Sequence, residues 1–308
     1  MIRALEDTRS GALTVRAAAK INLHLGVGAP REDGFHPLDT VYHAVSLYDD
    51  VSVAPAPEWT VETALAAYLE GVELPGPGEN IVDAVGRLLD PTGDRAAAVR
   101  IGKSIPVAGG MAGGSADAAA AMVALDRLWD LRTPDDELLR LAAELGSDVP
   151  FALLGGTARG QGRGELVTPV ADHGDYAWVL VPSERGLSTP EVYRRFDALF
   201  PDASPEPPSP TRVLEALSYG DTGRLAIALR NDLEPAALDL RPDLVGVLER
   251  GEAEGALRGI VSGSGPTCAF LCESHESAQT VADAMTGAGQ LALLALGPVA
   301  GAHVVEVL

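Results

Sequence analysis

A glycine-rich stretch in the first half of the chain limits most strongly what this sequence can fold into. Residues 106–121 read PVAGGMAGGSADAAAA, with four glycines in six positions followed at once by Ser115 and an alanine-rich run. Glycine adopts positive φ angles and lets a backbone approach a ligand closely, and a helix N-terminus adds N–H donors and partial positive charge. The stretch predicts a phosphate-binding loop or, alternatively, a flexible loop before a helix that Ser115 caps.

The loop departs from two familiar glycine-rich phosphate motifs. A Walker A motif places a lysine directly after its last glycine, and here Ser115 stands at that position. The G-x-G-x-x-G fingerprint of dinucleotide-binding proteins cannot be written on the stretch either. A phosphate bound here would therefore be held by a glycine-rich loop of a third type, different from both of these motifs.

The charge balance restricts the partners of a phosphate-binding chain. Lysine and arginine number 23 against 44 aspartates and glutamates, a formal net charge of −21. That balance argues against broad contact with nucleic acid or with an anionic membrane surface, because both are bound by neutralising their phosphates. Bound phosphates would need local donors, a few cations and a divalent metal. We therefore expect small-molecule ligands and no nucleic acid.

No targeting or membrane segment is visible in the sequence. The first residues, MIRALEDTRSGA, contain no apolar run of the kind a secretory leader needs, and no stretch of about 18 apolar residues marks a membrane span. Cys268 and Cys272 lie four positions apart in an apolar segment, too far to form a disulfide along one strand. We expect two buried thiols, no contact with membranes and a reducing, cytoplasmic location.

Lysine is almost absent from the chain. Only Lys20 and Lys103 are lysines, and every other cationic side chain is arginine. An ammonium is a compact charge that reaches a phosphate or carboxylate where a guanidinium does not fit. Lys103 lies just before the glycine-rich loop, and Lys20 lies in a second unusual stretch near the N-terminus. Unless this placement is chance, both lysines are candidate site residues.

A polar strand face near the N-terminus is a second candidate wall of a site. Residues 13–27 alternate as a strand does, which places Lys20, Asn22 and His24 on one face. Such a face is either solvated or part of a site. Side chains suited to holding a flat ring follow it; they are Phe35, His36, Tyr42 and His43. A metal site is the alternative for these histidines, although their spacing matches no zinc pattern.

The remaining chain mixes strands and helices without regular alternation. Strands are expected in 50–61, 96–105, 176–182 and 302–308, and a strand, a turn and a second strand in 258–272. Helices are expected in 80–89, 116–129, 134–145 and 274–288, with further helices starting near 189, 210, 222, 234 and 242. This mixture favours an α+β fold over a doubly wound sheet. The length allows two domains, and a shift in composition after about residue 165 suggests a first domain at 1–165 and a second at 166–308.

Asp148 is a lone acid between a helix end and an apolar turn. It follows the expected helix 134–145 and Gly146, and it precedes Val149, Pro150 and Phe151. On this local pattern alone, an N-cap aspartate worth about 1 kcal/mol is the favoured interpretation.

Three separated stretches resemble the three motifs of one family, the GHMP kinases. They are AAAKINLHLGV with GFHPLDTVYHAVSLYDDV, then IPVAGGMAGGSADAAAAM, then SGSGPTCAFL. The resemblance runs from about residue 14 to residue 272 and implies an N-terminal domain like domain 2 of ribosomal protein S5 and a ferredoxin-like C-terminal domain. Within the family, the chain is most similar to members that phosphorylate the 2-hydroxyl of a cytidine diphosphate alcohol in the non-mevalonate isoprenoid pathway.

The resemblance also implies roles for residues of the substrate site. Lys20 and Asp148 match the catalytic pair, in which the aspartate orients and deprotonates the hydroxyl while the lysine steadies charge on the γ-phosphoryl group. Asn22 would position the alcohol. Residues that would contact the rest of the substrate are Phe35 and Tyr42 on either side of the cytosine, His36 as its hydrogen-bond partner, Ser188 and Thr189, and Gly263 and Gly265 of the third motif.

ATP and Mg²⁺ are the implied co-substrate and metal. Asn80 and Lys103 match positions near the adenine and ribose. The metal would be carried by ATP, with Ser115 as a possible ligand. The loop residues expected around the phosphates are Pro106, Val107, Ala108, Gly109, Gly110, Met111, Ala112, Gly113, Gly114 and Ser115. Ala112 stands where many members have glycine, which leaves the local loop conformation open.

Two other functions fit parts of the pattern. The first is another small-molecule kinase of the same family, of the homoserine or mevalonate type, against which the aromatic residues near His36 argue. The second is a non-catalytic nucleotide-binding protein on the same fold, against which the presence of both Lys20 and Asp148 argues. We expect a monomer or a weak homodimer.

Overall fold

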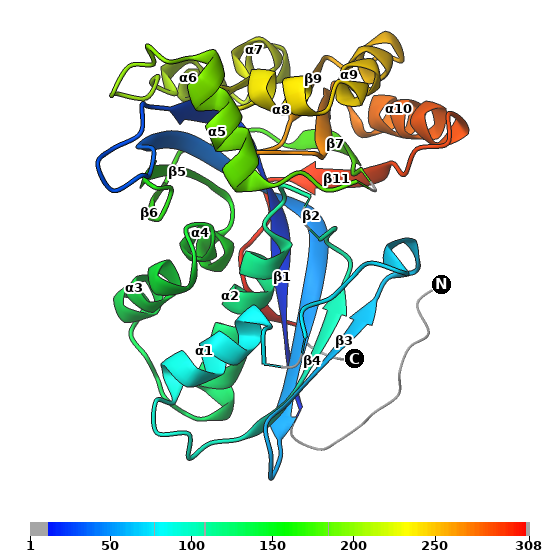
Figure 1. Ribbon diagram of the computed structural model, residues 1–308. Helices are drawn as coiled ribbons and strands as arrows, with labels where there is room; N and C mark the ends of the chain where they lie inside the picture. The colour runs from blue at the N-terminus through cyan, green and yellow to red at the C-terminus, as the bar shows by residue number, and fades with distance from the viewer. Residues whose placement is uncertain (1–11, 77, 108, 184, 306–308) are drawn as a thin grey trace.

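Two long antiparallel strands connect the two halves of the molecule. The computed structural model describes residues 12–305, with positions 77, 108 and 184 left out. Strand β1 (Leu13–Val27) and strand β2 (Leu38–Pro55) pair along almost their whole length, and Figure 1 shows them running from one end of the molecule to the other. The side chains of β1 are buried from Ala17 to Val27, so one strand presents residues to both halves.

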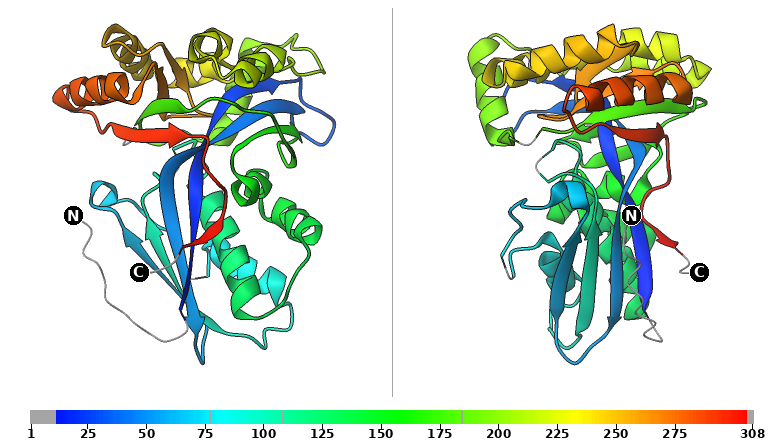
Figure 2. Two further views of the ribbon diagram at one scale, coloured as in Figure 1. Left: turned by 180° about the vertical axis from the view of Figure 1, so that it is seen from behind. Right: turned by 90° about the vertical axis from the view of Figure 1, so that its right-hand side faces the viewer.

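The first sheet has the strand order β12–β1–β2–β4–β3, with β5 added to β2, β6 added to β5, and β8 added to β1. The other strands are β3 (Thr60–Leu65), β4 (Ala97–Lys103), β5 (Thr157–Gly162), β6 (Leu166–Pro169), β8 (Arg230–Asn231) and β12 (His303–Val305). Four helices lie together on one side of β1 and β2 (Figures 1 and 2); they are α1 (Ile81–Leu89), α2 (Gly113–Leu128), α3 (Asp135–Leu145) and α4 (Val149–Leu154). A short 3₁₀ helix, η1, spans Ala67–Leu69.

The second sheet is antiparallel, with the order β11–β7–β10–β9. Its strands are β7 (Tyr176–Val181), β9 (Arg258–Val261), β10 (Cys268–Cys272) and β11 (Leu293–Gly297). The helices of this half are α5 (Thr189–Leu199), α6 (Thr211–Tyr219), α7 (Thr222–Ala228), α8 (Glu234–Leu240), α9 (Asp243–Ala253) and α10 (His275–Gly287). Figure 2 shows the helices of this half on the side of the sheet that faces away from the first half. The arrangement confirms the predicted α+β class and the two-part fold.

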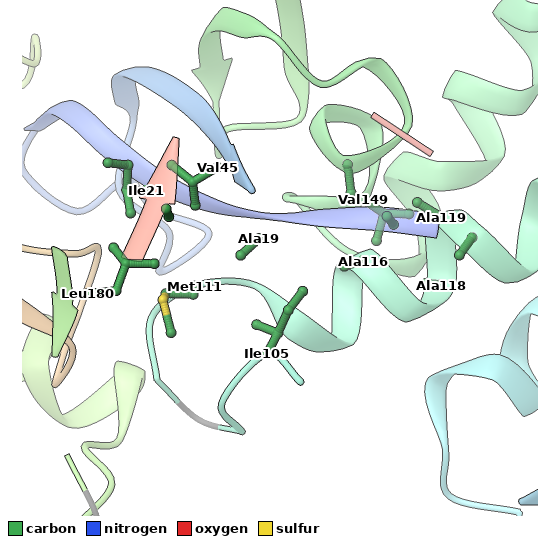
Figure 3. Close-up of a cluster of buried hydrophobic side chains, with 14 of the residues drawn as sticks. Ala19, Ile21, Val45, Ile105, Met111, Ala116, Ala118, Ala119, Val149 and Leu180 are labelled. Atoms are coloured by element: carbon green, nitrogen blue, oxygen red, sulfur yellow. The ribbon is translucent and has the colours of Figure 1, made fainter. Parts of the chain in front are cut away.

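Helix α2 forms the centre of the core. Eight of its side chains between Ala116 and Leu125 are buried apolar groups, six of them alanines. A helix that is apolar on nearly all sides is a buried one, and small side chains let it approach the sheet closely. Met111 of the glycine-rich loop is buried in the same cluster as Ala19, Ile105 and Leu180 (Figure 3). Met111 therefore anchors the loop to the core, while other loop residues line the cavity described below.

Most predicted elements are present. The strand predicted at 13–27 agrees with β1, and the helices at 80–89, 134–145 and 274–288 agree with α1, α3 and α10 within one residue at each end. The predicted closing strand is seen as β12, which pairs with β1 of the first sheet, and residues 306–308 lie outside the described part. Among the described residues, no helix has the length and apolar character needed to cross a bilayer.

Candidate active site

A cavity of about 880 Å³ lies where the two halves meet, a size typical of small-molecule sites. Both lysines of the chain line it. It collects most of the residues predicted for the site: Lys20, Asn22, Phe35, His36, Tyr42, Asn80, Lys103, Pro106, Val107, Gly109, Gly110, Ala112, Gly113, Gly114, Ser115, Asp148, Thr189 and Gly263. Met111 is buried behind the loop, Ser188 precedes helix α5 beside Thr189, Gly265 lies two positions after Gly263, and Ala108 is outside the described residues.

The glycine-rich loop presents backbone to this cavity. Gly110 has φ 78° and Ala112 has φ 56°, both in the left-handed region, and helix α2 then begins at Gly113. Ala112 holds the N-cap position, so Ser115 lies in the first turn of the helix and does not cap it. A Cβ added at Gly114 would meet nothing within 4 Å. The open side of the loop is thus the start of a helix, which suits an anion.

The third predicted motif holds this loop from the second half of the chain. The N–H of Thr267 donates to the carbonyl of Gly109 at 3.2 Å, and the Ser262 hydroxyl donates to the carbonyl of Gly110 at 3.1 Å. A Cβ at Gly110 would lie 2.3 Å from the Ser262 carbonyl oxygen, so the two segments touch through their backbones. The turn that contains Gly263 therefore closes the cavity over the loop.

Lys20 and Asp148 face each other across the cavity. The Lys20 Nζ lies 3.6 Å from Oδ2 of Asp148 and donates to Oδ1 of Asn22 at 2.8 Å. Asn22 in turn donates to the hydroxyl of Thr40 at 2.8 Å, which orients its amide. Asp148 precedes helix α4 at the N-cap position, yet its side chain makes no cap hydrogen bond. Its carboxylate, 29 % exposed, points to the lysine and the cavity, so the simple N-cap interpretation is wrong.

Lys103 has a different environment, although it lines the same cavity. Its Nζ donates to Oδ2 of Asp49 at 2.7 Å and to Oδ2 of Asp117 at 2.6 Å. Burial alone would lower the pKa of Lys103, but the carboxylates of Asp117 and Asp49 outweigh it and raise the pKa above its ordinary value. The predicted contact of Lys103 with adenine or ribose stays a prediction. Asn80 caps helix α1 by accepting the N–H of Val82 and also lines the cavity.

The other end of the cavity is aromatic. Phe35 is 50 % exposed, while the Nε2 atom of His36 lies 2.8 Å from Oδ1 of Asp197. The ring of Tyr193 lies 4.8 Å from the His36 ring, measured between centroids. Tyr193 lines the cavity from helix α5 and was not predicted from the sequence. A helical tyrosine more than 150 residues from His36 carries no local signal of this role.

Tyr42 lies deeper in the cavity wall than Phe35. Its ring is 4.9 Å from the ring of Phe151, and the Lys20 Nζ lies 5.5 Å from its centroid. Burial, with the neighbouring Asp148 carboxylate, raises the pKa of Tyr42 well above its usual value. Tyr42 is therefore a neutral phenol beside the Lys20–Asp148 pair, and the predicted stacking of Tyr42 on a base stays a prediction.

The remaining histidines of the N-terminal group are buried structural side chains. The Nε2 atom of His24 lies 2.9 Å from the carbonyl oxygen of Pro208. Nδ1 of His43 is 2.8 Å from the Thr157 hydroxyl, and burial lowers the pKa of His43 to about 3. His43 is thus neutral, and its contact with Asp172 at 3.7 Å is no ion pair. Neither histidine reaches the cavity among the described residues.

The chain is similar in sequence to known proteins. Models of the GHMP kinases N-terminal domain and the GHMP kinases C-terminal domain match residues 79–156 and 213–290. A 4-diphosphocytidyl-2-C-methyl-D-erythritol kinase of Nocardioides sp. strain JS614 is 62 % identical, over 95 % of this chain and 99 % of that protein. The protein of the same name from Mycolicibacterium smegmatis is 50 % identical, over 98 % of this chain and 95 % of the relative.

Solved structures with a similar fold include kinases of two types. A crystal structure of 4-(cytidine 5'-diphospho)-2C-methyl-D-erythritol kinase has a TM-score of 0.77 and 31 % identity, covering 93 % of this chain and 100 % of the other. A homoserine kinase from Cytophaga hutchinsonii has a TM-score of 0.67 and 18 % identity, covering 97 % and 99 %. The second likeness concerns the fold alone.

Proposed function

The chain belongs to the 4-diphosphocytidyl-2-C-methyl-D-erythritol kinases of the GHMP kinase family, and on that premise we propose that it transfers the γ-phosphoryl group of ATP to the 2-hydroxyl of that cytidine diphosphate alcohol. The observation that carries the proposal is one cavity that joins a phosphate-type loop, the Lys20–Asp148 pair and an aromatic end. The homoserine and mevalonate types are less well supported, because a small aliphatic substrate makes no use of Phe35, His36 and Tyr193.

Asp148 and Lys20 would act at the reacting atoms. Asp148 accepts a hydrogen bond from the substrate hydroxyl and takes its proton as the hydroxyl oxygen forms a bond to the γ-phosphorus. The bond from that phosphorus to the bridging oxygen breaks, and ADP leaves. Lys20, 3.6 Å from Asp148, offsets negative charge on the transferred group. Phosphoryl transfer depends mainly on such positioning and charge stabilisation, and the hydrogen bond to Asn22 fixes the ammonium in place.

The loop would bind the ATP phosphates through backbone N–H groups at the start of helix α2. Mg²⁺ would offset phosphate charge when bound. The described residues contain no group of three or more carboxylate, imidazole or thiol ligands for a metal, so the metal would be carried mainly by the phosphates. The hydroxyl of Ser115, which lines the cavity, is the oxygen ligand that the chain would add. Asn80 and Lys103 would lie towards the adenine and ribose.

The cytosine would bind at the aromatic end. Phe35 is exposed towards the cavity, and Tyr193 faces it from helix α5. Tyr42 has Phe151 and Lys20 as neighbours, whereas Phe35 and Tyr193 line the cavity near His36, so we assign the base to Phe35 and Tyr193. His36, held by Asp197 at 2.8 Å, would supply the directional hydrogen bond. Gly263 and the Thr189 hydroxyl, which lies 2.7 Å from that of Ser264, would contact the remainder of the substrate.

We propose that the enzyme acts as a monomer or weak homodimer. Cys268 and Cys272 are free and buried, as expected for a protein of the cytoplasm.

The test is ADP formation from ATP and Mg²⁺ with the cytidine diphosphate alcohol, compared with homoserine and mevalonate. We expect turnover with the first substrate only. Clear turnover with either of the others, and none with the cytidine compound, would overturn the substrate assignment while leaving the kinase assignment intact.

A further inference from the structure

Three buried charged residues lie next to the two ends of the glycine-rich loop, and two of them, Lys103 and Asp117, also line the cavity. Lys103 ends strand β4, Asp49 lies on strand β2, and Asp117 lies on helix α2, and their exposed fractions are 6 %, 0 % and 4 %. Such burial of three charges is expensive unless they are paired. We refer to Asp49, Lys103 and Asp117 as the loop clamp.

One member of the clamp fixes the beginning of the loop. Oδ1 of Asp49 accepts the backbone N–H of Ser104 at 2.6 Å and that of Ile105 at 2.8 Å. These two residues immediately precede Pro106, where the loop starts. The other oxygen of the same carboxylate accepts the Lys103 ammonium at 2.7 Å. Asp49 thus ties the entry of the loop to strand β2 and to the lysine.

The other two members fix the end of the loop. Lys103 Nζ donates to Asp117 at 2.6 Å, and a Cβ added at Gly113 would lie only 3.2 Å from the same nitrogen. Gly113 and Asp117 are four positions apart, so they share one face of helix α2. The ammonium therefore lies beneath the first turn of the helix, whose N–H groups would face the phosphates.

We propose that the loop clamp is a positioning device, which sets the phosphate-binding conformation of residues 106–112 by holding both ends of the loop to one ammonium. This inference rests on the proposed function, in which that loop binds the phosphates of ATP. It differs from the role carried over by resemblance, in which Lys103 contacts adenine or ribose. Two of the three N–H donors of the ammonium are already used by carboxylates.

A ligand that has phosphates but no base or ribose distinguishes loop positioning by Lys103 from direct contact of Lys103 with adenine or ribose. Lys103→Met removes the ammonium, and the probes are ATP and inorganic tripolyphosphate, each with Mg²⁺, and the cytidine diphosphate alcohol, measured by calorimetry. A misplaced binding group commonly costs one to two orders of magnitude. We expect ATP and tripolyphosphate to bind about tenfold more weakly, by the same factor, while the affinity for the cytidine compound is unchanged.

Several results would overturn the clamp. Weaker ATP binding with unchanged tripolyphosphate binding would assign Lys103 to the base or ribose. Equal weakening of all three ligands would indicate general loss of structure, and no change in a folded variant would remove the residue from the site. If the wild-type protein binds neither ATP nor tripolyphosphate, the proposed function fails; if it binds both and the variants do too, only the clamp fails.

Two further variants keep the test decisive if Lys103→Met does not fold. Asp117→Ala leaves the Asp49–Lys103 pair and the entry of the loop intact, and should weaken ATP and tripolyphosphate by an equal, smaller factor; selective weakening of either ligand would contradict the clamp. Arg241→Met is the matched control, because Arg241 is a 5 % exposed cation that binds Asp243 and Ser183 away from the cavity. Arg241→Met should lower the melting temperature and leave all three affinities unchanged. A selective loss of ATP binding in Arg241→Met would also contradict the clamp.

Discussion

The two lysines of the chain line one cavity but differ in how they are bound. Lys20 lies 3.6 Å from a single, partly exposed carboxylate and donates to one neutral group, the side-chain amide of Asn22. Lys103 is held by two buried carboxylates at 2.6 and 2.7 Å. A loosely paired ammonium is available to a ligand, whereas a tightly paired one is committed to the fold. Two residues of the same type in one cavity therefore have different proposed roles, Lys20 in the reaction and Lys103 in positioning the loop.

The largest expected effect is on catalysis by Lys20. Lys20→Met should lower kcat by about three orders of magnitude, as expected for the loss of a charge that acts in the transition state. It should lower the free energy of unfolding less than Lys103→Met does, because the one carboxylate left without a partner, Asp148, is partly exposed to water. Steady-state kinetics and urea denaturation measure the two quantities. A kcat within a few-fold of the wild-type value would show that the two lysines do not differ in the way described.

The loss of folding stability should be larger for Lys103→Met than for Lys20→Met. Lys103→Met leaves Asp49 and Asp117 buried without their counter-charge, and removing one partner of a buried ion pair costs about 3–5 kcal/mol. We expect the free energy of unfolding to fall by about that amount, more than in Lys20→Met. Equal losses in the two variants, measured by the same urea titrations, would contradict the comparison.

His43 extends the comparison to a buried side chain that stays neutral, although the Asp172 carboxylate lies 3.7 Å away. The pKa of His43 is about 3 in the folded protein because of burial, and about 6.5 in the unfolded chain. Below pH 6.5 the unfolded chain therefore binds a proton that the native protein does not, so stability falls as the pH falls from 6.5 towards 3. His43 should account for a loss of about 2 kcal/mol between pH 6.5 and pH 5.

The measurement is the pH dependence of urea unfolding in the wild type and in His43→Gln. The variant starts from a lower stability, because it alters a packed site, yet it should lose about 2 kcal/mol less over the same pH interval. Parallel pH profiles would show that His43 is not the buried neutral group described here.

The smallest effect concerns the loop backbone itself. Ala112 has φ 56°, a conformation that costs a residue with a Cβ about 1 kcal/mol. Ala112→Gly should raise the stability by about 0.5 kcal/mol, since the greater freedom of glycine in the unfolded chain offsets part of the gain. Chemical denaturation measures this, with KM for ATP as the check that the loop still binds; a loss of stability would indicate that Ala112 is not strained.

The sequence predicts the parts of the site that depend on local pattern. Glycine content predicts the loop at 106–115, and periodicity predicts the strand face with Lys20 and Asn22. The scarcity of lysine in the composition predicts that both lysines belong to the site. Asp148 gains a role only through the family resemblance, because its local pattern favours a cap that the structure does not contain. Asp49, Asp117 and Tyr193 were not singled out, since their roles depend on contacts between segments far apart in the chain.

The same limit applies to the fold. Strands β5 and β11 were missed because their ladders depend on partners distant in sequence, β2 and β7 respectively. Helix α4 was read as a turn because it has only six residues, of which four are buried. Burial against the rest of the core, and not intrinsic preference, determines these elements.

The measurement closest to the central claim is the single-turnover rate of phosphoryl transfer from ATP to 4-diphosphocytidyl-2-C-methyl-D-erythritol by Asp148→Asn. The amide keeps the size of the side chain and cannot take the proton of the hydroxyl. We expect the rate to fall by about three orders of magnitude, with the affinity for ATP unchanged. Transfer at close to the wild-type rate would show that Asp148 does not serve the reacting hydroxyl and that the cavity works in another way.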